Sequence, residues 1–133
     1  MPANLHVGQN NFSQTATTTT ETLVAFLSAY QVNNPSGEGV QLNGHLAFTP
    51  GTAATAATIR IRQGQGITGS VVGQPFVRTV TAAQATSMSM AVLDAFNLTS
   101  SLAYSLTIQF TAATADSTIV LANLSAMCAT LSE

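Results

Sequence analysis

Charge is what this sequence has least of. Among 133 residues, three are basic and five are acidic, so 6 % of the chain is charged, where an ordinary globular domain has about 25 %. Lysine is absent, and the formal net charge is −2. Proteins bind phosphate backbones through clustered Lys and Arg, and polybasic segments attach proteins to anionic membranes. We therefore expect no nucleic-acid partner and no membrane partner.

Long apolar runs, a leader sequence and paired cysteines are missing as well. No apolar run approaches the roughly 20 residues that a membrane helix requires. The first six residues, MPANLH, lack the basic start and the apolar centre of a secretory signal. We therefore expect no signal peptide and a product that stays in the cytoplasm of the cell that makes it. Cys128 is the single cysteine, which excludes an intrachain disulfide.

What the sequence does contain is a repeated alternation of apolar and polar residues. In residues 55–63, two isoleucines alternate with Arg60 and Arg62, so the arginines share one face of a predicted strand. The same period of two runs through residues 40–48, 87–92 and 104–110, and we expect a further short strand at residues 76–80, after Pro75. We expect the first of these strands to be interrupted at Asn43-Gly44. Turn sequences rich in Gly, Pro, Asn and Ser separate the segments.

Residues 21–32 (ETLVAFLSAYQV) fit the spacing of a helix and also that of a strand. The threonines before them and the turn sequence at residues 33–37 favour a strand. With it, about seven or eight strands follow one another at a spacing of roughly 8–15 residues, and no helix is convincing. The fold class we predict is all-β, a two-sheet antiparallel β-sandwich.

Residues 1–19 form a polar lead with few apolar anchors, among them Leu5 and Phe12. We predict an extended N-terminal arm over residues 1–19 that lies on another molecule, with room for one short strand near Leu5. The sandwich domain is expected to occupy residues 20–133.

The last predicted strand, residues 118–131, is apolar on both faces. Ile119 and Leu121 share one face, and Val120 and Leu124 share the other. A strand with two apolar faces is covered on both sides. We expect the second cover to be another subunit, which predicts a homo-oligomer with Val120 and Leu124 in its interface.

Three segments follow one another in an order that has a parallel in a known family. The first is TETL at residues 20–23, which leads into the opening strand. The second spans residues 43–73 and runs from Asn43-Gly44 through ATIRIRQG and ITG. The third is AYSLTIQF at residues 103–110, which continues through TAATADS into the last strand. Together, over residues 20–131, they resemble a jelly-roll module of structural proteins in tailed-phage virions.

The resemblance implies a jelly-roll sandwich and a place in the virion. Such modules are usually homotrimers that serve as head decorations, head fibres or receptor-binding tips. For this chain the resemblance implies a decoration or cement protein on the virus head, bound to the major capsid protein or another virion protein. The alternative is a receptor- or glycan-binding tip. Sugar sites usually carry exposed aromatic residues, and a chain with no Trp and two Tyr argues against a glycan site without excluding it.

Several patterns that can indicate chemistry are better explained by structure. Residues 64–69 (GQGITG) match the dinucleotide pattern G-x-G-x-x-G, but strand and turn residues follow where a helix would have to begin, so we predict an inter-strand loop. His6 and His45 would bind a metal only by meeting copies of themselves on a rotation axis, since neither has another ligand at suitable spacing. The acids are scattered, and no serine elbow occurs. We expect no enzyme activity, catalytic residue, cofactor or metal.

Arg60 and Arg62 have two interpretations. They share one strand face, and one interpretation is that this face is simply solvated. The other is a subunit or lattice contact, in which they pair with Glu38, Asp94, Asp116 or a partner's carboxylate. The candidate interface residues are Arg60, Arg62, Leu5, Phe12, Val120 and Leu124.

Overall fold

The computed structural model describes residues 4–10, 14–16, 20–33, 40–53, 55–64, 66–94, 99–111 and 117–128. Within these ranges the chain forms nine β-strands and no helix. The strands are β1 (Asn4–Asn10), β2 (Gln14–Ala16), β3 (Thr22–Asn33), β4 (Val40–Thr49), β5 (Ala56–Gln63), β6 (Val71–Thr79), β7 (Thr86–Asp94), β8 (Thr99–Phe110) and β9 (Ser117–Cys128).

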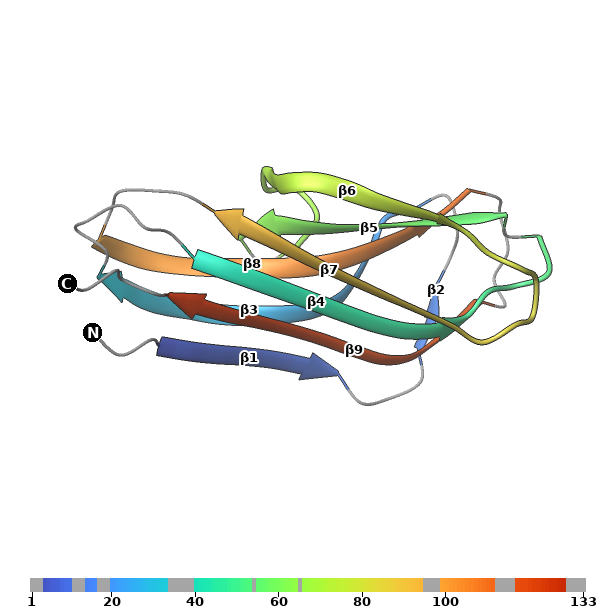
Figure 1. Ribbon diagram of the computed structural model, residues 1–133, viewed down its shortest axis with the longest axis horizontal. Helices are drawn as coiled ribbons and strands as arrows, with labels where there is room; N and C mark the ends of the chain where they lie inside the picture. The colour runs from blue at the N-terminus through green and yellow to red at the C-terminus, as the bar shows by residue number, and fades with distance from the viewer. Residues whose placement is uncertain are drawn as a thin grey trace.

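The strands form two antiparallel sheets that pack face to face (Figure 1). Sheet A has the order β1-β9-β4-β7, and sheet B has the order β3-β8-β5-β6. β1 and β2 both pair with β9, β2 with its beginning and β1 with the rest of it. Together they therefore occupy one strand position at the edge of sheet A. The result is the eight-position, two-sheet arrangement of a jelly roll. The predicted all-β antiparallel sandwich of jelly-roll type is therefore confirmed.

The core lies between the sheets because each strand buries one of its two faces. The residues that β4 and β5 bury alternate along each strand; they are Val40, Leu42, Gly44, Leu46, Phe48, Ala57, Ile59 and Ile61. The rings of Phe48 and Phe110 meet edge to face between the sheets, with their centroids 5.5 Å apart. Removing these side chains from water is the main favourable contribution to the stability of the sandwich.

Gly44 sits where β4 was expected to break, yet β4 continues through it without interruption. A Cβ at this position would lie 3.0 Å from Cδ1 of Leu106 and 3.6 Å from Cδ1 of Ile61, both on the opposite sheet. Glycine is thus present because the two sheets approach closely here. The predicted interruption at Asn43-Gly44 is wrong for this reason.

The other strands predicted from alternation are found as β3, β5, β7 and β8. Residues 21–32, which fitted either a helix or a strand, fall almost entirely within β3. β8 begins at Thr99, inside a segment expected to turn, because Thr99 pairs with Asn33 at the far end of β3. A long partner strand has extended β8 beyond the point that its own sequence suggests.

Along β9, the buried residues have odd numbers at the beginning of the strand and even numbers further on. Ile119 is buried, whereas further on the buried residues are Ala122, Leu124 and Ala126. Between them, Val120 is 51 % exposed. The change means that one extra residue has been inserted into the strand.

The extra residue is Val120. The pairing with β4 shifts register at this point, from Ile119 opposite Phe48 to Leu121 opposite Ala47, which leaves Val120 without a partner in a β-bulge. The bulge explains why the sequence of β9 is apolar on both faces: the apolar residues before and after it face the same core. The two apolar faces therefore do not call for a second subunit.

The N-terminal strands belong to sheet A. β1 pairs with β9 from Asn4 opposite Cys128 to Asn10 opposite Ala122, and β2 pairs with the beginning of β9. Residues 4–10 and 14–16 are extended and pair with β9 of their own chain, and the predicted contact with another molecule stays a prediction. The physical reason for the pairing is that this edge of β9 presents N–H and C=O groups that β1 and β2 satisfy. Residues on both sides of residue 19, the expected boundary between arm and sandwich, therefore form strands of the sheets.

β6 is longer and more exposed than the sequence suggests. It begins at Val71, within the segment expected to be a Gly-rich loop, and continues through Pro75. Its pairing with β5 shifts register between Ile59 and Ile61, where residues 73–75 form an irregular segment. Proline and irregular segments are typical of edge strands, because they block pairing with a further strand.

Replacing Gly73 with alanine is expected to destabilise the fold by about 2 kcal/mol, because a positive φ and a steric clash act together. Gly73 has a φ of 71°, and a Cβ there would lie 2.8 Å from Cγ1 of Val92 on β7. Gly64→Ala is the matched control, since Gly64 has a φ of 85° and no atom within 4 Å of an added Cβ. Urea unfolding should show the larger loss for Gly73→Ala; equal losses would contradict the close contact between β6 and β7.

Candidate functional site

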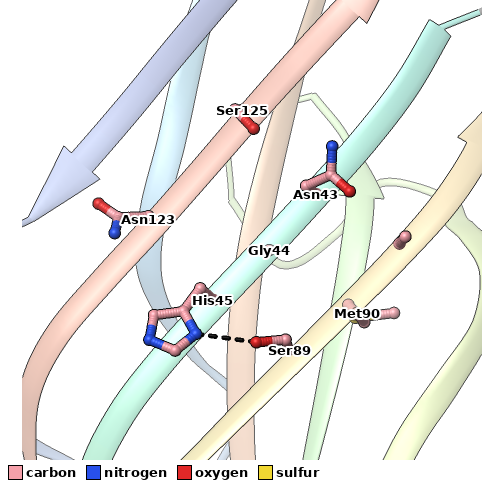
Figure 2. Close-up of a pocket in the computed structure, with 8 residues that line it drawn as sticks. Asn43, Gly44, His45, Ser89, Met90, Asn123 and Ser125 are labelled. Atoms are coloured by element: carbon pink, nitrogen blue, oxygen red, sulfur yellow. Dashed lines mark hydrogen bonds between the residues drawn. The ribbon is translucent and has the colours of Figure 1, made fainter.

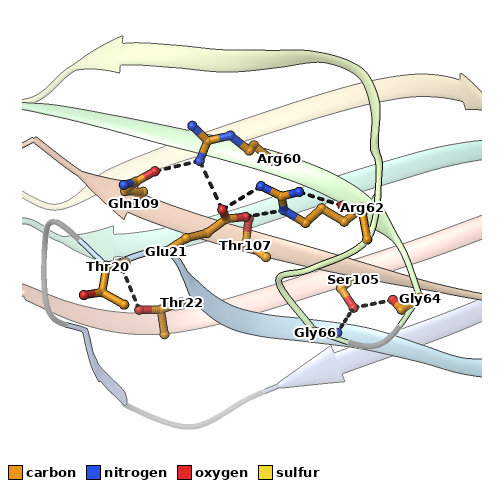
Figure 3. Close-up of polar contacts among 11 residues, drawn as sticks. Thr20, Glu21, Thr22, Arg60, Arg62, Gly64, Gly66, Ser105, Thr107 and Gln109 are labelled. Carbon is orange, nitrogen blue, oxygen red and sulfur yellow. Dashed lines mark hydrogen bonds and ion pairs between the residues drawn. The ribbon is translucent and has the colours of Figure 1, made fainter.

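The outer face of sheet B carries a compact ion-pair cluster (Figure 3). Arg62 donates two hydrogen bonds to the carboxylate of Glu21, from Nε to Oε2 at 2.7 Å and from Nη2 to Oε1 at 2.8 Å. Nη1 of Arg60 lies 3.6 Å from Oε1 of the same carboxylate. Two parallel hydrogen bonds are the strong form of arginine–carboxylate pairing. Because Glu21 precedes β3, the cluster ties the start of β3 to β5 across β8.

Polar side chains of β8 complete this cluster. Thr107 donates a hydrogen bond to Oε2 of Glu21, and Nη1 of Arg60 donates to Oε1 of Gln109 at 2.8 Å. The hydrogen bond from Arg62 is the main reason that the pKa of Glu21 lies below its usual value of 4.5, although burial opposes it. The same pairing raises the pKa of Arg62. Both charges are thus engaged within the chain, so the cluster stabilises the fold.

The glycine pattern at residues 64–69 lies in the loop between β5 and β6. Oγ of Ser105 donates to the carbonyl of Gly64 at 2.6 Å and accepts from the N–H of Gly66 at 2.9 Å. Nη1 of Arg62 donates to the carbonyl of Gly69 at 2.6 Å. The loop is therefore held against β8 and the ion-pair cluster, and the predicted inter-strand loop is what the structure shows.

The acid that binds the arginines is not one of those expected from the sequence. Glu21 was overlooked because the sequence does not show that β3, β8 and β5 are neighbours. Asp94, one of the expected acids, instead accepts a hydrogen bond from the hydroxyl of Tyr104 at 2.6 Å. Glu38 and Asp116 lie outside the described residues.

The outer face of sheet A has, among the described residues, no charged side chain. Its residues are neutral and mostly small, and the register arranges them in rows across β9, β4 and β7. One row is Asn123, His45 and Ser89, and the next is Ser125, Asn43 and Ala91. The two outer faces of the sandwich therefore differ in kind, since one holds an ion cluster and the other is uncharged.

A hollow of about 390 Å³ lies over these two rows (Figure 2). The residues that line it are Asn43, Gly44, His45, Ser89, Met90, Ala91, Asn123 and Ser125. The short side chains of Ser89, Ala91 and Ser125 leave the space open, and the longer asparagine and histidine side chains border it. Alternation along β4 produces this arrangement, because the residues that flank Gly44 in sequence point away from the core.

His45 and Asn123 are the groups in the hollow with the most distinctive hydrogen bonding. Nδ1 of His45 lies 2.8 Å from Oγ of Ser89, at hydrogen-bond distance. Oδ1 of Asn123 is buried and has no hydrogen-bond partner among the described residues. A buried acceptor left unpaired costs about 1–3 kcal/mol and is uncommon in folded proteins. The hollow therefore has hydrogen-bonding capacity that the chain itself does not use.

Neither histidine lies in a metal centre within the described part of the chain. There the structure contains no group of three His, Cys, Asp or Glu side chains that could hold an ion. His45 belongs to the hollow, and His6 is a residue of β1. In the same ranges no helix is long and apolar enough to cross a membrane.

The structure describes the side chains of some of the predicted interface residues. Val120 is exposed at the bulge, while Leu124 is completely buried in the core of its own chain, so we leave Leu124 out of any contact surface. Leu5 is paired with Met127 in the register of β1 and β9. Phe12 lies outside the described residues.

Sequence reasoning missed the exposed apolar residues of β6. Phe76 is 38 % exposed and Val77 is 59 % exposed. A short strand was predicted here from Phe76, Val77 and Val80, but such a prediction does not tell which strand of a sheet lies at its edge. Pro75 was the available signal, because proline within a strand marks an edge position.

Glu21 is expected to stabilise the fold at neutral pH and to lose this effect in acid. Folding lowers its pKa, so the stabilisation is fully present above the unfolded value near 4.5 and disappears as the pH falls through the lower folded value. Glu21→Gln should therefore reduce the free energy of unfolding by about 2 kcal/mol at pH 7.

Urea unfolding of both proteins from pH 7 down to pH 3 checks this expectation. The difference between wild type and Glu21→Gln should shrink once the pH is below the unfolded value. As a comparison at pH 7, Arg62→Gln should cost more stability than Arg60→Gln, because Arg62 makes the two-bond contact. A difference that does not change with pH would contradict the assigned role of the carboxylate.

Comparison with known proteins bears on the fold. No family model matches this sequence, and no curated protein matches it. The fold is similar to a structure of the infectious bursal disease virus Gx strain, with a TM-score of 0.56 and 11 % identity over 96 % of this chain and 32 % of that one. It is also similar to the VP2 subviral particle of that virus, with a TM-score of 0.51 and 12 % identity over 94 % of this chain and 32 % of that one.

A bacterial protein shares the fold as well. Dimeric latent PorU from Porphyromonas gingivalis matches with a TM-score of 0.53 and 7 % identity, over 94 % of this chain and 12 % of that one. The chain spans about a third of the length of the viral chains. At these identities the comparisons show a jelly-roll β-sandwich of the kind found in virus-particle proteins, and this likeness is not specific to tailed phages.

Proposed function

We propose that this chain is a non-enzymatic structural protein of a virion, an oligomeric jelly-roll module that decorates or cements the capsid. The observation that carries the proposal is a virus-particle type of sandwich with an accessible surface of 6473 Å², formed by a chain that has only three basic and five acidic residues. Charged residues are depleted from the cores of protein interfaces. A surface poor in charge can be covered by neighbouring subunits without the high cost of removing water from ions.

The resemblance to tailed-phage modules supports the finer part of this proposal. Its segments lie at β3, at β4 to β6 and at β8 to β9, which are the four strands of sheet B and the two inner strands of sheet A. A place on the virus head follows from the resemblance, with the major capsid protein or another virion protein as the partner. The virion is then the location of the protein.

We propose that the contact between copies lies at the outer edge of sheet B. Phe76 and Val77 of β6 expose large apolar side chains there. Exposed apolar groups that lie close together mark surfaces of interaction. Pro75 hinders pairing with a further strand along this edge, so the contact would be made by side chains.

The described acids support a structural role and not a catalytic one. The carboxylate of Glu21 is bound by Arg62 and Thr107, and that of Asp94 is bound by Tyr104. Acid–base chemistry with two carboxylates needs both of them to face one cleft. These two belong to different sheets, and each already has a partner within the chain.

A receptor- or glycan-binding tip is the second candidate function. The observation that favours it is the uncharged hollow on the outer face of sheet A. This face is separate from the β6 edge, so one module could assemble through β6 and present the hollow to another molecule. The two functions are therefore compatible in one protein.

An oligomer is expected in solution, and the phage resemblance favours a trimer. Val77→Glu should shift the native mass toward the monomer, because it would bury a charge in a contact made by apolar side chains. Ala53→Glu adds the same charge at an exposed turn between β4 and β5 and should leave the mass unchanged. Light scattering or native mass spectrometry measures both. A monomeric wild-type protein, or equal behaviour of the two variants, would contradict the proposal.

Leu5 and Phe12 are proposed to contact the capsid. The full chain with Leu5→Ser and Phe12→Ser should be retained on purified particles about tenfold less well, which corresponds to the loss of one modest apolar contact. Gln9→Ser in the same segment is the control and should be retained normally. Substitutions are preferable to deletion, because removal of residues 1–19 would also remove β1 and β2. Equal retention of all three proteins would count against an anchoring N-terminal segment.

A further inference from the structure

The hollow on sheet A is a formed site that contact at the β6 edge would leave open. It lies in the middle of the outer face, over β9, β4 and β7, and not among the loops at either end of the sandwich (Figure 2). The hydrogen bonds of the sheet fix the backbone of these strands, and thereby the direction in which each side chain leaves it. The lining of the hollow is therefore largely set before any ligand arrives, which favours binding.

The lining is uncharged but rich in hydrogen-bonding groups. Asn43 and Asn123 each offer an amide donor and an amide acceptor, and Ser89 and Ser125 offer hydroxyl groups that can do both. The lining contains no carboxylate, Lys or Arg. A charged ligand would lose water here without gaining an opposite charge. The chemistry of the hollow therefore selects a neutral ligand that has many donors and acceptors of its own.

The hollow also has an apolar part. Ala91 and Met90 contribute apolar side chains from β7. Polar groups from neighbouring strands therefore border an apolar floor. A sugar ring has the matching distribution, because its hydroxyl groups point outward from the rim and its C–H groups lie on its faces. The volume of about 390 Å³ falls within the usual range of small-molecule sites.

Asn123 supplies a separate reason to expect a ligand. Its Oδ1 is buried and unpaired among the described residues, although the residue borders a hollow lined by other polar groups. The amide of Asn123 therefore has hydrogen-bonding capacity that the described residues do not use, at the border of a space that could hold a ligand.

From these observations we propose that the hollow formed by Asn43, His45, Asn123 and Ser125 binds a neutral carbohydrate. His45 is held by Ser89 through Nδ1, so its ring has a fixed place at the border of the site. This inference rests on the second candidate function and names its ligand class. It does not depend on the contact at the β6 edge.

The test is titration of the full chain with neutral oligosaccharides built from glucose, galactose or mannose, followed by calorimetry or NMR. Uronic-acid and sulfated oligosaccharides of the same length are the charged comparison. At least one neutral sugar should bind, and the charged sugars should bind about tenfold more weakly or not at all. Absence of binding by every neutral sugar, or a preference for the charged ones, would overturn the proposal.

Two substitutions in the hollow locate the binding site. Asn123→Leu has nearly the same shape and removes the unpaired acceptor, so it should weaken sugar binding about tenfold while leaving the melting temperature unchanged or higher. His45→Ala should weaken binding as well. Thr58→Val on the outer face of sheet B is the matched control and should bind normally. Full binding by both hollow variants would overturn the assignment of the site.

Measuring the native mass distinguishes failure of the carbohydrate proposal from failure of the proposed assembly through β6. Asn123→Leu should keep the oligomeric state of the wild type while it loses sugar binding, because the hollow and the β6 edge are different surfaces. If the wild type is oligomeric but binds no sugar, the carbohydrate proposal alone fails. If sugar binding is lost only when the oligomer dissociates, the hollow of a single chain is not the site and the proposal is also overturned.

Discussion

Close packing of the two sheets at the middle of the sandwich is the constraint on which the rest of the structure depends. Gly44 on sheet A leaves room for Leu106 and Ile61 of sheet B, and the rings of Phe48 and Phe110 meet between the sheets. This packing uses the inner face of every central strand. Everything that the protein presents to another molecule must therefore come from the two outer faces, the strand edges and the loops.

The scarcity of charge acquires a specific meaning once the outer faces are compared. On sheet B, the carboxylate of Glu21 pairs with both Arg60 and Arg62, and the cluster fastens β3 to β5. The described part of sheet A has no charge on its outer face, so it can be covered by a neighbour or a neutral ligand at little electrostatic cost. Among the described residues, the charges of Glu21, Arg60 and Arg62 therefore stabilise the fold, and the outer face of sheet A is neutral.

Alternation in the sequence was sufficient to predict the fold class, because burial of one face fixes the period of two along strands such as β5. It failed where long-range packing decides the local structure. Val120 is a bulge only because β9 pairs with β4, and Glu21 meets Arg62 only because β3 and β5 flank β8. The hollow was not predictable either, since Asn123 and His45 become neighbours through pairing of distant strands. Single residues suggested chemistry, but the sheet register determined which of them meet.

We propose that this jelly roll assembles with copies of itself through the exposed edge of sheet B. Hydrogen–deuterium exchange of the wild-type oligomer and of the Val77→Glu variant tests this proposal most directly. Amides of β6, residues 71–79, should exchange more slowly in the wild type than in Val77→Glu, while those of the central strand β8 should be protected in both proteins. Equal exchange of β6 in the two proteins would contradict the proposal.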